Sequence, residues 1–290
     1  MNESEKRRLL VLPIALALWA GLAWAGGQGS VRIGRVPLFV LCVDLAMAIQ
    51  WVAFVPAFLL RTERFFDLTG SLTYLICTAV AVTFGPELGL RSAILAALVV
   101  VWAARLGSFL FLRIVREGAD RRFDEIRGSF VRFFVAWTLQ GVWVTFTMGA
   151  ALAVITSERP QSLGILGWTG LTLWLAGFGM EAVADAQKKR FRSRPENAER
   201  FISSGLWAWS RHPNYFGEIL LWLGVAMIAT PALVGWQYVT LLSPVFVTLL
   251  LTKVSGIPLL EERADTKWGG SPEYEAYKAA TPVLVPRPPR

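Results

Sequence analysis

The sequence predicts an all-α protein, a polytopic membrane bundle of seven or eight transmembrane helices. Hydrophobic residues make up 54% of the 290-residue chain and charged residues only 17%, with a mean hydropathy of +0.49. Ordinary soluble domains are less apolar and carry more charge. Lipid offers the backbone no hydrogen-bond partners, and the long apolar stretches lack the two-residue alternation of strands. We therefore expect helices.

Eight apolar stretches are candidates for the roughly 20-residue spans that cross a bilayer. They are Leu9–Ala25, Val36–Leu60, Phe65–Phe84, Ser92–Val115, Phe130–Ile155, Ile165–Val183, Tyr215–Ala229 and Tyr238–Ile257. The last two are closely set and parted by a turn at Pro231. The sequence thus leaves seven or eight spans open, within one integral membrane domain over residues 1–290.

Lysine and arginine gather in alternate connections of this arrangement. The basic segments are Lys6–Arg8, Arg61 with Arg64, Arg113–Arg132, Lys188–Arg211 and the tail. Cytoplasmic loops carry such an excess, so we expect both termini in the cytoplasm and the chain in a bacterial-type inner membrane. Arg32 and Arg35 are exceptions. The net charge of +8 then reflects topology, with anionic lipid or a phosphorylated cofactor as an additional explanation and no nucleic acid as a partner.

The two cysteines, Cys42 and Cys77, both lie inside predicted spans. Their number and spacing exclude a disulfide framework or a zinc site, so we predict no metal. Charged residues inside spans cost at least a few kcal/mol each and are candidates for function. For Asp44, Arg105 and Glu181, a buried pair that fixes how helices meet is as good an interpretation as catalysis.

The most informative region runs from Ala184 to Glu218. Lys188 and Arg192 are four residues apart, so they share a face if the sixth helix continues past Asp185, and together they can bind a phosphate. Asn214 can hydrogen-bond an amide or a ribose, and Tyr215 can stack on a ring. The alternative is an ordinary basic loop beside the membrane.

This region resembles the carboxy-terminal half of the steroid 5-alpha-reductase superfamily, and most closely a bacterial branch of uncharacterised membrane proteins. The resemblance covers at least residues 105–282. It rests on Asp185–Lys188 with Phe191 and Arg192, on Arg211–Tyr215, and on Glu261, Glu262, Lys267–Gly269, Tyr274, Tyr277 and Pro282. The first two runs are similar to sterol reductases that saturate a ring double bond with NADPH. Leu139–Gly141 is similar to a segment of the steroid 5-alpha-reductases.

The resemblance implies that residues 161–290 hold NADPH, while residues 1–160 form a cavity for a hydrophobic, steroid- or lipid-like substrate reached from the membrane. It implies these nucleotide contacts: Asp185, Lys188, Arg192, Arg211, His212, Asn214, Tyr215, Glu218, Glu261 and Tyr277. His212, the only histidine, either contacts the cofactor or shapes the turn. The implied reaction moves a hydride to an activated carbon–carbon double bond while an acid supplies a proton.

The proton donor is the point where this chain departs from the steroid 5-alpha-reductases. These relatives use a tyrosine and a glutamate on the amino-terminal spans, and Trp102 stands where that tyrosine is expected. We predict Asp67 and Tyr74 as the catalytic substitutes, because they are seven residues apart and lie on nearly the same helical face. The alternative is that Asp67 only begins a helix and Tyr74 only packs.

Two other functions stay open. An Arg-His-Pro-x-Tyr run followed by Glu-Glu is also similar to membrane methyltransferases that modify isoprenylcysteine carboxylates or phospholipids with S-adenosylmethionine. The cations Lys188, Arg190, Arg192 and Arg194 favour a dinucleotide with a 2′-phosphate instead. The third possibility is a non-enzymatic lipid-binding or scaffold protein, in which the polar clusters serve folding alone.

Overall fold

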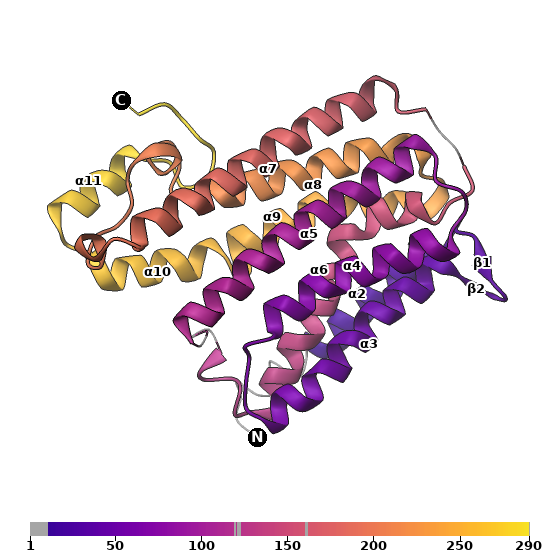
Figure 1. The fold of residues 1–290 in the computed structure, drawn as a ribbon, viewed down its shortest axis with the longest axis horizontal. Coiled ribbons are helices and arrows are strands. Elements are labelled where there is room, and N and C mark those ends of the chain that lie inside the picture. The colour runs from indigo at the N-terminus through magenta and orange to yellow at the C-terminus, as the bar shows by residue number, and fades with distance from the viewer. Residues whose placement is uncertain (1–10, 119, 121–122, 160–161, 290) are drawn as a thin grey trace. The chain divides into compact units, whose positions relative to one another are not determined.

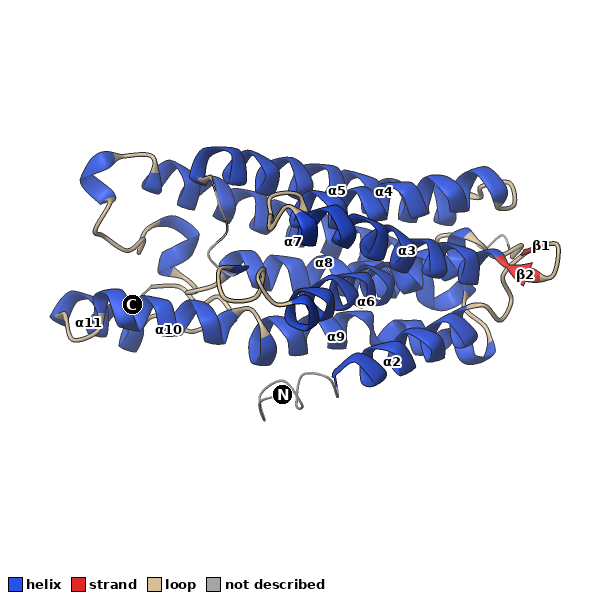
Figure 2. Ribbon diagram, turned by 90° about the horizontal axis from the view of Figure 1, so that it is seen from below, coloured by secondary structure: helices blue, strands red, loops and turns tan. Residues whose placement is uncertain are grey.

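A computed structural model describes residues 11–118, 120, 123–159 and 162–289 (Figure 1). Almost all regular structure in these residues is helical, as predicted, and Figure 2 shows one short hairpin beside the helices. The hairpin pairs β1 (Arg32–Ile33) with antiparallel β2 (Val36–Pro37). Gly34 lies between the strands at φ +62°, a conformation that glycine adopts without strain.

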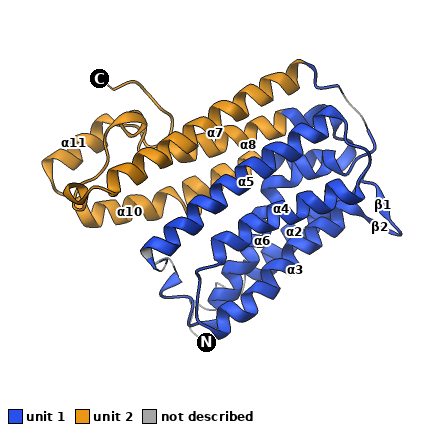
Figure 3. Cartoon of the chain, viewed as in Figure 1, with its two compact units in different colours: residues 1–164, 228–243 blue, residues 165–227, 244–290 orange. Residues whose placement is uncertain are grey.

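The helices form two compact units, coloured separately in Figure 3. Unit 1 comprises residues 1–164 and 228–243, and unit 2 comprises residues 165–227 and 244–290. The first break along the chain follows Gly164. The return of residues 228–243 to unit 1 was not expected. The roles assigned to the halves stay predictions.

Unit 1 is built around one central helix. Its helices are α2 (Val11–Gly26), α3 (Leu38–Leu59), α4 (Phe66–Phe84), α5 (Leu90–Glu117) and α6 (Phe130–Ile155), followed by the 3-10 helix η5 (Gly235–Leu242). Helix α6 contacts all the others, and its residues from Val144 to Ile155 are all buried. The buried run includes small residues such as Gly149 and Ala153, and a Cβ atom on Gly149 would lie 3.7 Å from the Thr240 side chain.

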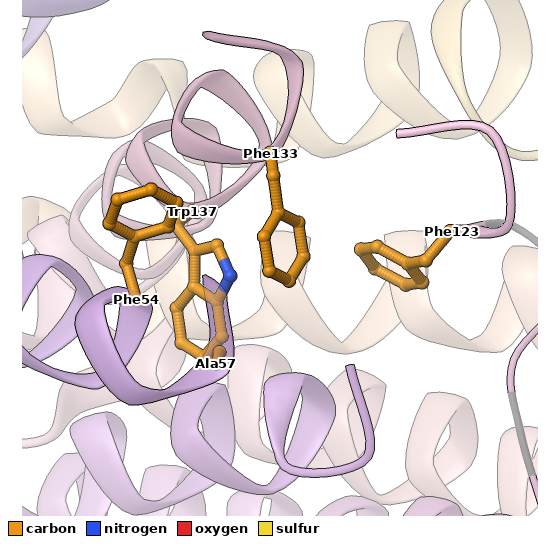
Figure 4. Packing of buried hydrophobic residues seen from close by; sticks show 5 residues of the cluster. All are labelled: Phe54, Ala57, Phe123, Phe133 and Trp137. Atoms are coloured by element: carbon orange, nitrogen blue, oxygen red, sulfur yellow. The ribbon is translucent and has the colours of Figure 1, made fainter. Parts of the chain in front are cut away.

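One end of α6 carries an aromatic cluster (Figure 4). It is formed by Phe54, Ala57, Phe123, Phe133 and Trp137, which come from α3, the α5–α6 connection and α6. Phe54 and Phe133 meet with ring centroids 5.8 Å apart at 61°, one of the edge-on arrangements that aromatic pairs prefer. The cluster packs the α5–α6 connection against the helices of unit 1.

Unit 2 consists of two long helices followed by shorter pieces. The long helices are α7 (Gly164–Arg192) and α8 (Pro213–Ala229), and the short 3-10 helices η2 (Pro195–Asn197) and η3 (Gly205–Ala208) lie between them in the chain. After α9 (Ser243–Leu249) come a π-helical turn, η6 (Leu250–Val254), then α10 (Ile257–Trp268) and α11 (Pro272–Ala280). The stretch predicted as one last span, Tyr238–Ile257, therefore changes helix type along its length.

Glycines bring α7 and α8 together in unit 2. A Cβ atom on Gly177 would lie 2.6 Å from the Gly217 carbonyl oxygen, and one on Gly224 would lie 2.5 Å from the Gly170 carbonyl oxygen. On each helix the two glycines are seven residues apart, or two turns, so they mark one seam along which the backbones touch. This seam fixes the register of the two helices that carry much of the predicted cofactor site.

Six helical segments among the described residues are long and apolar enough to cross a membrane. They are Leu38–Leu59, Phe66–Phe84, Leu90–Arg116, Phe130–Ile155, Pro213–Ala232 and Gly235–Trp268. The protein is thus polytopic, as predicted. The described part of the first predicted span is a shorter apolar helix, Val11–Gly26, and glycine, threonine and tryptophan dilute the apolar residues of α7. A count of seven or eight stays a prediction.

Candidate functional site

Helices α7 and α8 of unit 2 place several of the predicted cofactor residues side by side. Next to the glycine seam, Asn214 in the first turn of α8 donates from Nδ2 to Oδ1 of Asp185 on α7, at 3.2 Å. Asp185 is buried, as are Glu181 on α7 and Glu218 on α8. The bond between Asp185 and Asn214 joins two residues that we had predicted to contact a nucleotide separately.

Glu261 of α10 joins the two residues that precede α8. One carboxylate oxygen lies 2.7 Å from Nη1 of Arg211, and the other lies 2.7 Å from Nε2 of His212. Burial lowers the pKa of His212 below its ordinary value, although Glu261 acts in the opposite direction. The ring is therefore neutral at pH 7, with Nε2–H donating to the carboxylate. The ring also stacks on Tyr215, with centroids 5.7 Å apart.

Trp207, in η3, connects α7 to α11. Its indole nitrogen donates to the carbonyl of Ala184 at 3.0 Å, and its own carbonyl accepts from the Tyr277 hydroxyl at 2.7 Å. The ammonium of Lys188 lies 4.5 Å from the centre of the indole ring, a cation–π contact. Trp207 thereby fixes the positions of two predicted cofactor residues, Lys188 and Tyr277.

The turn before Trp207 depends on Gln187 and Gly205. The side-chain oxygen of Gln187 accepts from the backbone N–H of Leu206 at 3.0 Å. Gly205 has φ +64°, and a Cβ atom there would lie 2.6 Å from Nε2 of Gln187. Both conformation and space therefore require glycine. Gln187 and Trp207 were not among our predicted site residues, although both lie in the region Ala184–Glu218 and Gln187 lies in a segment that carried the resemblance.

An open groove of about 420 Å³ lies in unit 2, and we call it the aromatic groove. Its lining residues are Glu199, Arg200, Phe201, Ser203, Trp268, Ser271, Glu273 and Tyr277. Phe201 contacts Tyr277 with ring centroids 5.3 Å apart and Trp268 at 6.0 Å. The groove thus combines flat aromatic faces with hydroxyl groups and charges of both signs.

The ten predicted cofactor residues all lie in unit 2, and six of them belong to two sets of contacting residues. Glu261 contacts Arg211 and His212, and His212 stacks on Tyr215. Lys188 and Tyr277 both contact Trp207. Helix α7 continues to Arg192, so Lys188 and Arg192 share a face as predicted. Arg192 is exposed at the end of the helix.

The two predicted catalytic residues, Asp67 and Tyr74, lie on α4 of unit 1, where different helices engage them. Asp67 pairs with Arg113 of α5 at 3.4 Å. Tyr74 is buried, and its hydroxyl hydrogen-bonds with that of Thr147 on α6. The Thr147 hydroxyl donates to a backbone carbonyl of its own helix, so Tyr74 is the donor to Thr147.

Tyr74 also contacts Trp102, which stands where the relatives were expected to carry a tyrosine. Its ring packs edge-on against Trp102 of α5, with centroids 5.2 Å apart at 83°. Trp102 is almost completely buried. The tyrosine of α4 therefore lies directly beside the position on α5 where the relatives were expected to carry one.

These features define a polytopic helical membrane protein whose second unit carries a polar, aromatic site. The chain belongs to the family described as protein of unknown function (DUF1295), a steroid 5-alpha-reductase-like family, which matches residues 53–281. The membership confirms the superfamily that the motifs indicated. The bacterial branch stays a prediction.

Individual relatives match over shorter stretches. An uncharacterised protein of Schizosaccharomyces pombe is 25% identical over 50% of this chain and 51% of its own length. The delta(14)-sterol reductases of Neurospora crassa and Ascobolus immersus are each 32% identical, over 27% and 28% of this chain and 19% and 22% of their own lengths. The chain thus spans about half of the length of the first relative and about a fifth of the length of the other two. No solved structure matches it significantly.

Proposed function

We propose that the protein is an NADPH-dependent membrane reductase, which transfers a hydride to an activated carbon–carbon double bond of a hydrophobic, steroid- or lipid-like substrate. The observation that carries the proposal is the aromatic groove, which shares Tyr277 with the Trp207–Lys188 contact at the basic end of α7. The similarity to two fungal delta(14)-sterol reductases supports the reaction class.

The residues of unit 2 fit such a cofactor. The groove volume of about 420 Å³ falls within the range of small-molecule sites. Phe201, Trp268 and Tyr277 offer faces on which a base or nicotinamide ring can stack. Arg200, Lys188 and Arg192 offer charges for phosphates. When bound, NADPH supplies the hydride.

The chain's own residues hold and shape this site. Trp207 keeps the Lys188 ammonium in place through the cation–π contact. The ion pair between Glu261 and Arg211, together with the bond from His212, fixes the loop that leads into α8. Because His212 is neutral and its Nε2–H is already donated to Glu261, we assign it to positioning this loop rather than to contact with substrate.

We assign the proton donor to Tyr74 in unit 1. Its hydroxyl donates to Thr147, and its ring lies against Trp102. A tyrosine that is already a hydrogen-bond donor in a buried, apolar setting can turn this proton toward a bound carbonyl or carbanion. Asp67, paired with Arg113, contributes charge balance at the beginning of α4 rather than a direct relay to Tyr74.

We further propose that Val11–Gly26 and the first two thirds of α7 also cross the membrane, giving eight spans in a bacterial inner membrane. Helix α7 has 29 residues, about 43 Å of helix, which exceeds a hydrocarbon core of about 30 Å. Both termini then lie in the cytoplasm. Reporter fusions after Gly85 and after Arg194 should report opposite sides of the membrane, and reports from the same side would refute this arrangement.

Ligand-dependent thermal unfolding of the full-length protein in a neutral detergent tests the cofactor. We expect NADPH to raise the melting temperature more than NADH or S-adenosylmethionine does. The double variant Lys188→Ala with Arg192→Ala should weaken NADPH binding by tenfold or more, because each charge-assisted hydrogen bond is worth about 1.5–3 kcal/mol.

The matched control is Arg116→Ala with Lys253→Ala, which removes the same charge from two exposed residues outside the predicted cofactor contacts. It should bind NADPH nearly as the parent does. A response to S-adenosylmethionine alone would replace the reductase by the methyltransferase alternative. If none of the three compounds changes the melting temperature at saturation, the lipid-binding or scaffold alternative is favoured.

A further inference from the structure

A second groove, of about 370 Å³, lies in unit 1 and takes no part in the proposed reaction. We call it the α4–α5 groove, because it lies where α4 ends and α5 begins. Its lining residues are Pro86, Glu87, Leu88, Gly89, Arg91, Ser92, Val154, Ser157, Glu158 and Arg159. The end of α6 forms its other side.

Arg91 is the buried charge of this groove, with only 3% of its surface exposed. Its Nη atoms donate to the backbone carbonyls of Ser162, Leu163 and Ile228. Within the described part of the chain, no carboxylate pairs with it and its Nε–H finds no acceptor. A buried guanidinium is costly unless it is paired, and carbonyl dipoles balance its charge only in part.

Ser157 contributes a second buried polar group to the same groove. Its hydroxyl is buried, with 7% of the residue exposed, and it too lacks a hydrogen-bond partner among the described residues. Buried polar atoms without partners are rare in folded proteins, and each calls for an explanation such as an ion or water. Here two donors, one of them charged, line a single groove.

We infer that the α4–α5 groove binds an oxyanion, either free phosphate or the phosphate of a lipid headgroup. The anion would accept from Nε of Arg91 and from the hydroxyl of Ser157, at the N-terminal end of α5, where the helix dipole also favours negative charge. Exposed Glu87, Glu158 and Arg159 carry the remaining charges. They keep their contact with solvent, whereas the buried charge is positive.

The position of the groove suits a ligand at the membrane surface. Helix α4 ends at Phe84 and α5 begins at Leu90, so the groove lies at the ends of two helices that can cross the membrane. Phe84 and Leu90 are 59% and 61% exposed. These apolar side chains suit the headgroup level, where acyl chains pass beside a bound phosphate. This inference does not depend on the proposed reductase activity.

Thermal unfolding of the full-length protein in a neutral detergent tests the inference with two probes. One is sodium phosphate against sodium chloride at equal ionic strength. The other is dioctanoyl phosphatidylglycerol against dioctanoylglycerol, which lacks the phosphate. We expect stabilisation by at least one phosphate-bearing probe. If phosphate stabilises the protein at least as much as phosphatidylglycerol does, the ligand is a free anion. If only phosphatidylglycerol stabilises it, the ligand is a lipid headgroup.

Ser157→Ala is the decisive variant, because it removes a hydroxyl without breaking a hydrogen bond to any described residue. Without a probe it should melt as the parent does, while its affinity for the stabilising probe falls about tenfold. Ser108→Ala is the control, since this exposed α5 hydroxyl only contacts its own backbone. If no phosphate-bearing probe stabilises the parent protein beyond its matched control, or if Ser157→Ala binds as tightly as the parent, the inference is wrong.

Discussion

Units 1 and 2 join their helices by different means. In unit 2, α7 and α8 touch backbone to backbone, and a Cβ atom on Gly177 would lie 2.6 Å from the Gly217 carbonyl oxygen. In unit 1, the central helix α6 meets side chains: a Cβ atom on Gly141 would lie 2.8 Å from the Met47 sulfur. A flexible methionine can move aside, whereas a helix backbone cannot. The α7–α8 contact of unit 2 is therefore the more rigid of the two, and the contact at Gly141 in unit 1 the more adjustable.

The polar contacts of the two units also differ, in the charge of the residues that make them. Inside the spans of unit 1, neutral pairs join the helices, such as Gln50 with Thr73 at 2.8 Å and Tyr74 with Thr147. The ion pair between Asp67 and Arg113 lies at the ends of α4 and α5. Unit 2 uses charges at the ends of its helices, where Glu261 contacts both Arg211 and His212. Neutral pairs are far less costly than charges within hydrocarbon. Arg211 and Glu261 keep 12% and 22% of their side chains exposed, and the neighbouring His212 can respond to pH.

Tyr74→Phe gives the largest expected effect and tests whether unit 1 does more than enclose a substrate. Loss of a general acid slows turnover by about a hundredfold or more. We expect that decrease in NADPH consumption, measured with a steroid- or lipid-like substrate that the parent protein reduces. The lost hydrogen bond should cost only about 1 kcal/mol of stability.

The response of the melting temperature to NADPH should be unchanged in Tyr74→Phe, because the cofactor site is assigned to unit 2. Tyr238→Phe, a change of the same kind at an exposed residue of unit 1, is the control. Full turnover in Tyr74→Phe would leave this tyrosine as a packing residue and move the acid elsewhere.

Gly177→Ala tests the rigidity of the α7–α8 seam. The new methyl group meets the backbone of α8, so we expect a loss of about 1–3 kcal/mol in thermal unfolding. The control is Gly179→Ala, which adds the same methyl group to the same helix. Nothing lies within 4 Å of this methyl group. It should be neutral or slightly stabilising, since alanine favours helix over glycine.

Gly141→Ala extends the same test to unit 1. Its methyl group meets Met47, so we expect a smaller loss than for Gly177→Ala. Equal losses at Gly141 and Gly177 would remove the distinction between the two units.

The sequence predicted the helices well where the length of an apolar stretch alone determines the structure. Phe130–Ile155 was predicted as a span with the same bounds that α6 has, because length and apolarity determine a membrane helix. The division of Tyr238–Ile257 into 3-10, α and π pieces was not predicted. It depends on local hydrogen-bond registers around Pro244 and Gly256 that hydropathy does not report.

The sequence predicted which segments form the candidate site, but not the hydrogen bonds and contacts within it. The segment from Asp185 to Tyr215 indicated charged and aromatic groups close together in the chain. The pairing of Asp185 with Asn214, and the contacts that Trp207 makes, arise from the packing of α7 against its neighbours. The bond between Tyr74 and Thr147 joins residues 73 positions apart, a separation that no local spacing rule addresses.

His212→Gln gives the smallest expected effect and tests whether the charged end of unit 2 is sensitive to pH. Burial lowers the pKa of His212 in the folded protein, whereas an unfolded chain has a histidine pKa of about 6.5. Above that value both states are neutral and the stability is fully present. As the pH falls below about 6.5, the unfolded state takes up the proton first and the folded state loses stability. One proton limits this slope to about 1.4 kcal/mol per pH unit.

Because His212 is the only histidine, melting temperatures measured between pH 8 and pH 5 isolate its contribution before most carboxylates titrate. We expect the parent protein to lose stability below about pH 6.5 and His212→Gln to lose less over the same interval. In Glu261→Gln the pKa of His212 should fall further, since the carboxylate no longer favours the charged ring, so the loss on acidification should extend to lower pH. A pH profile that is the same in all three proteins would show that this end of unit 2 does not respond to the protonation of His212.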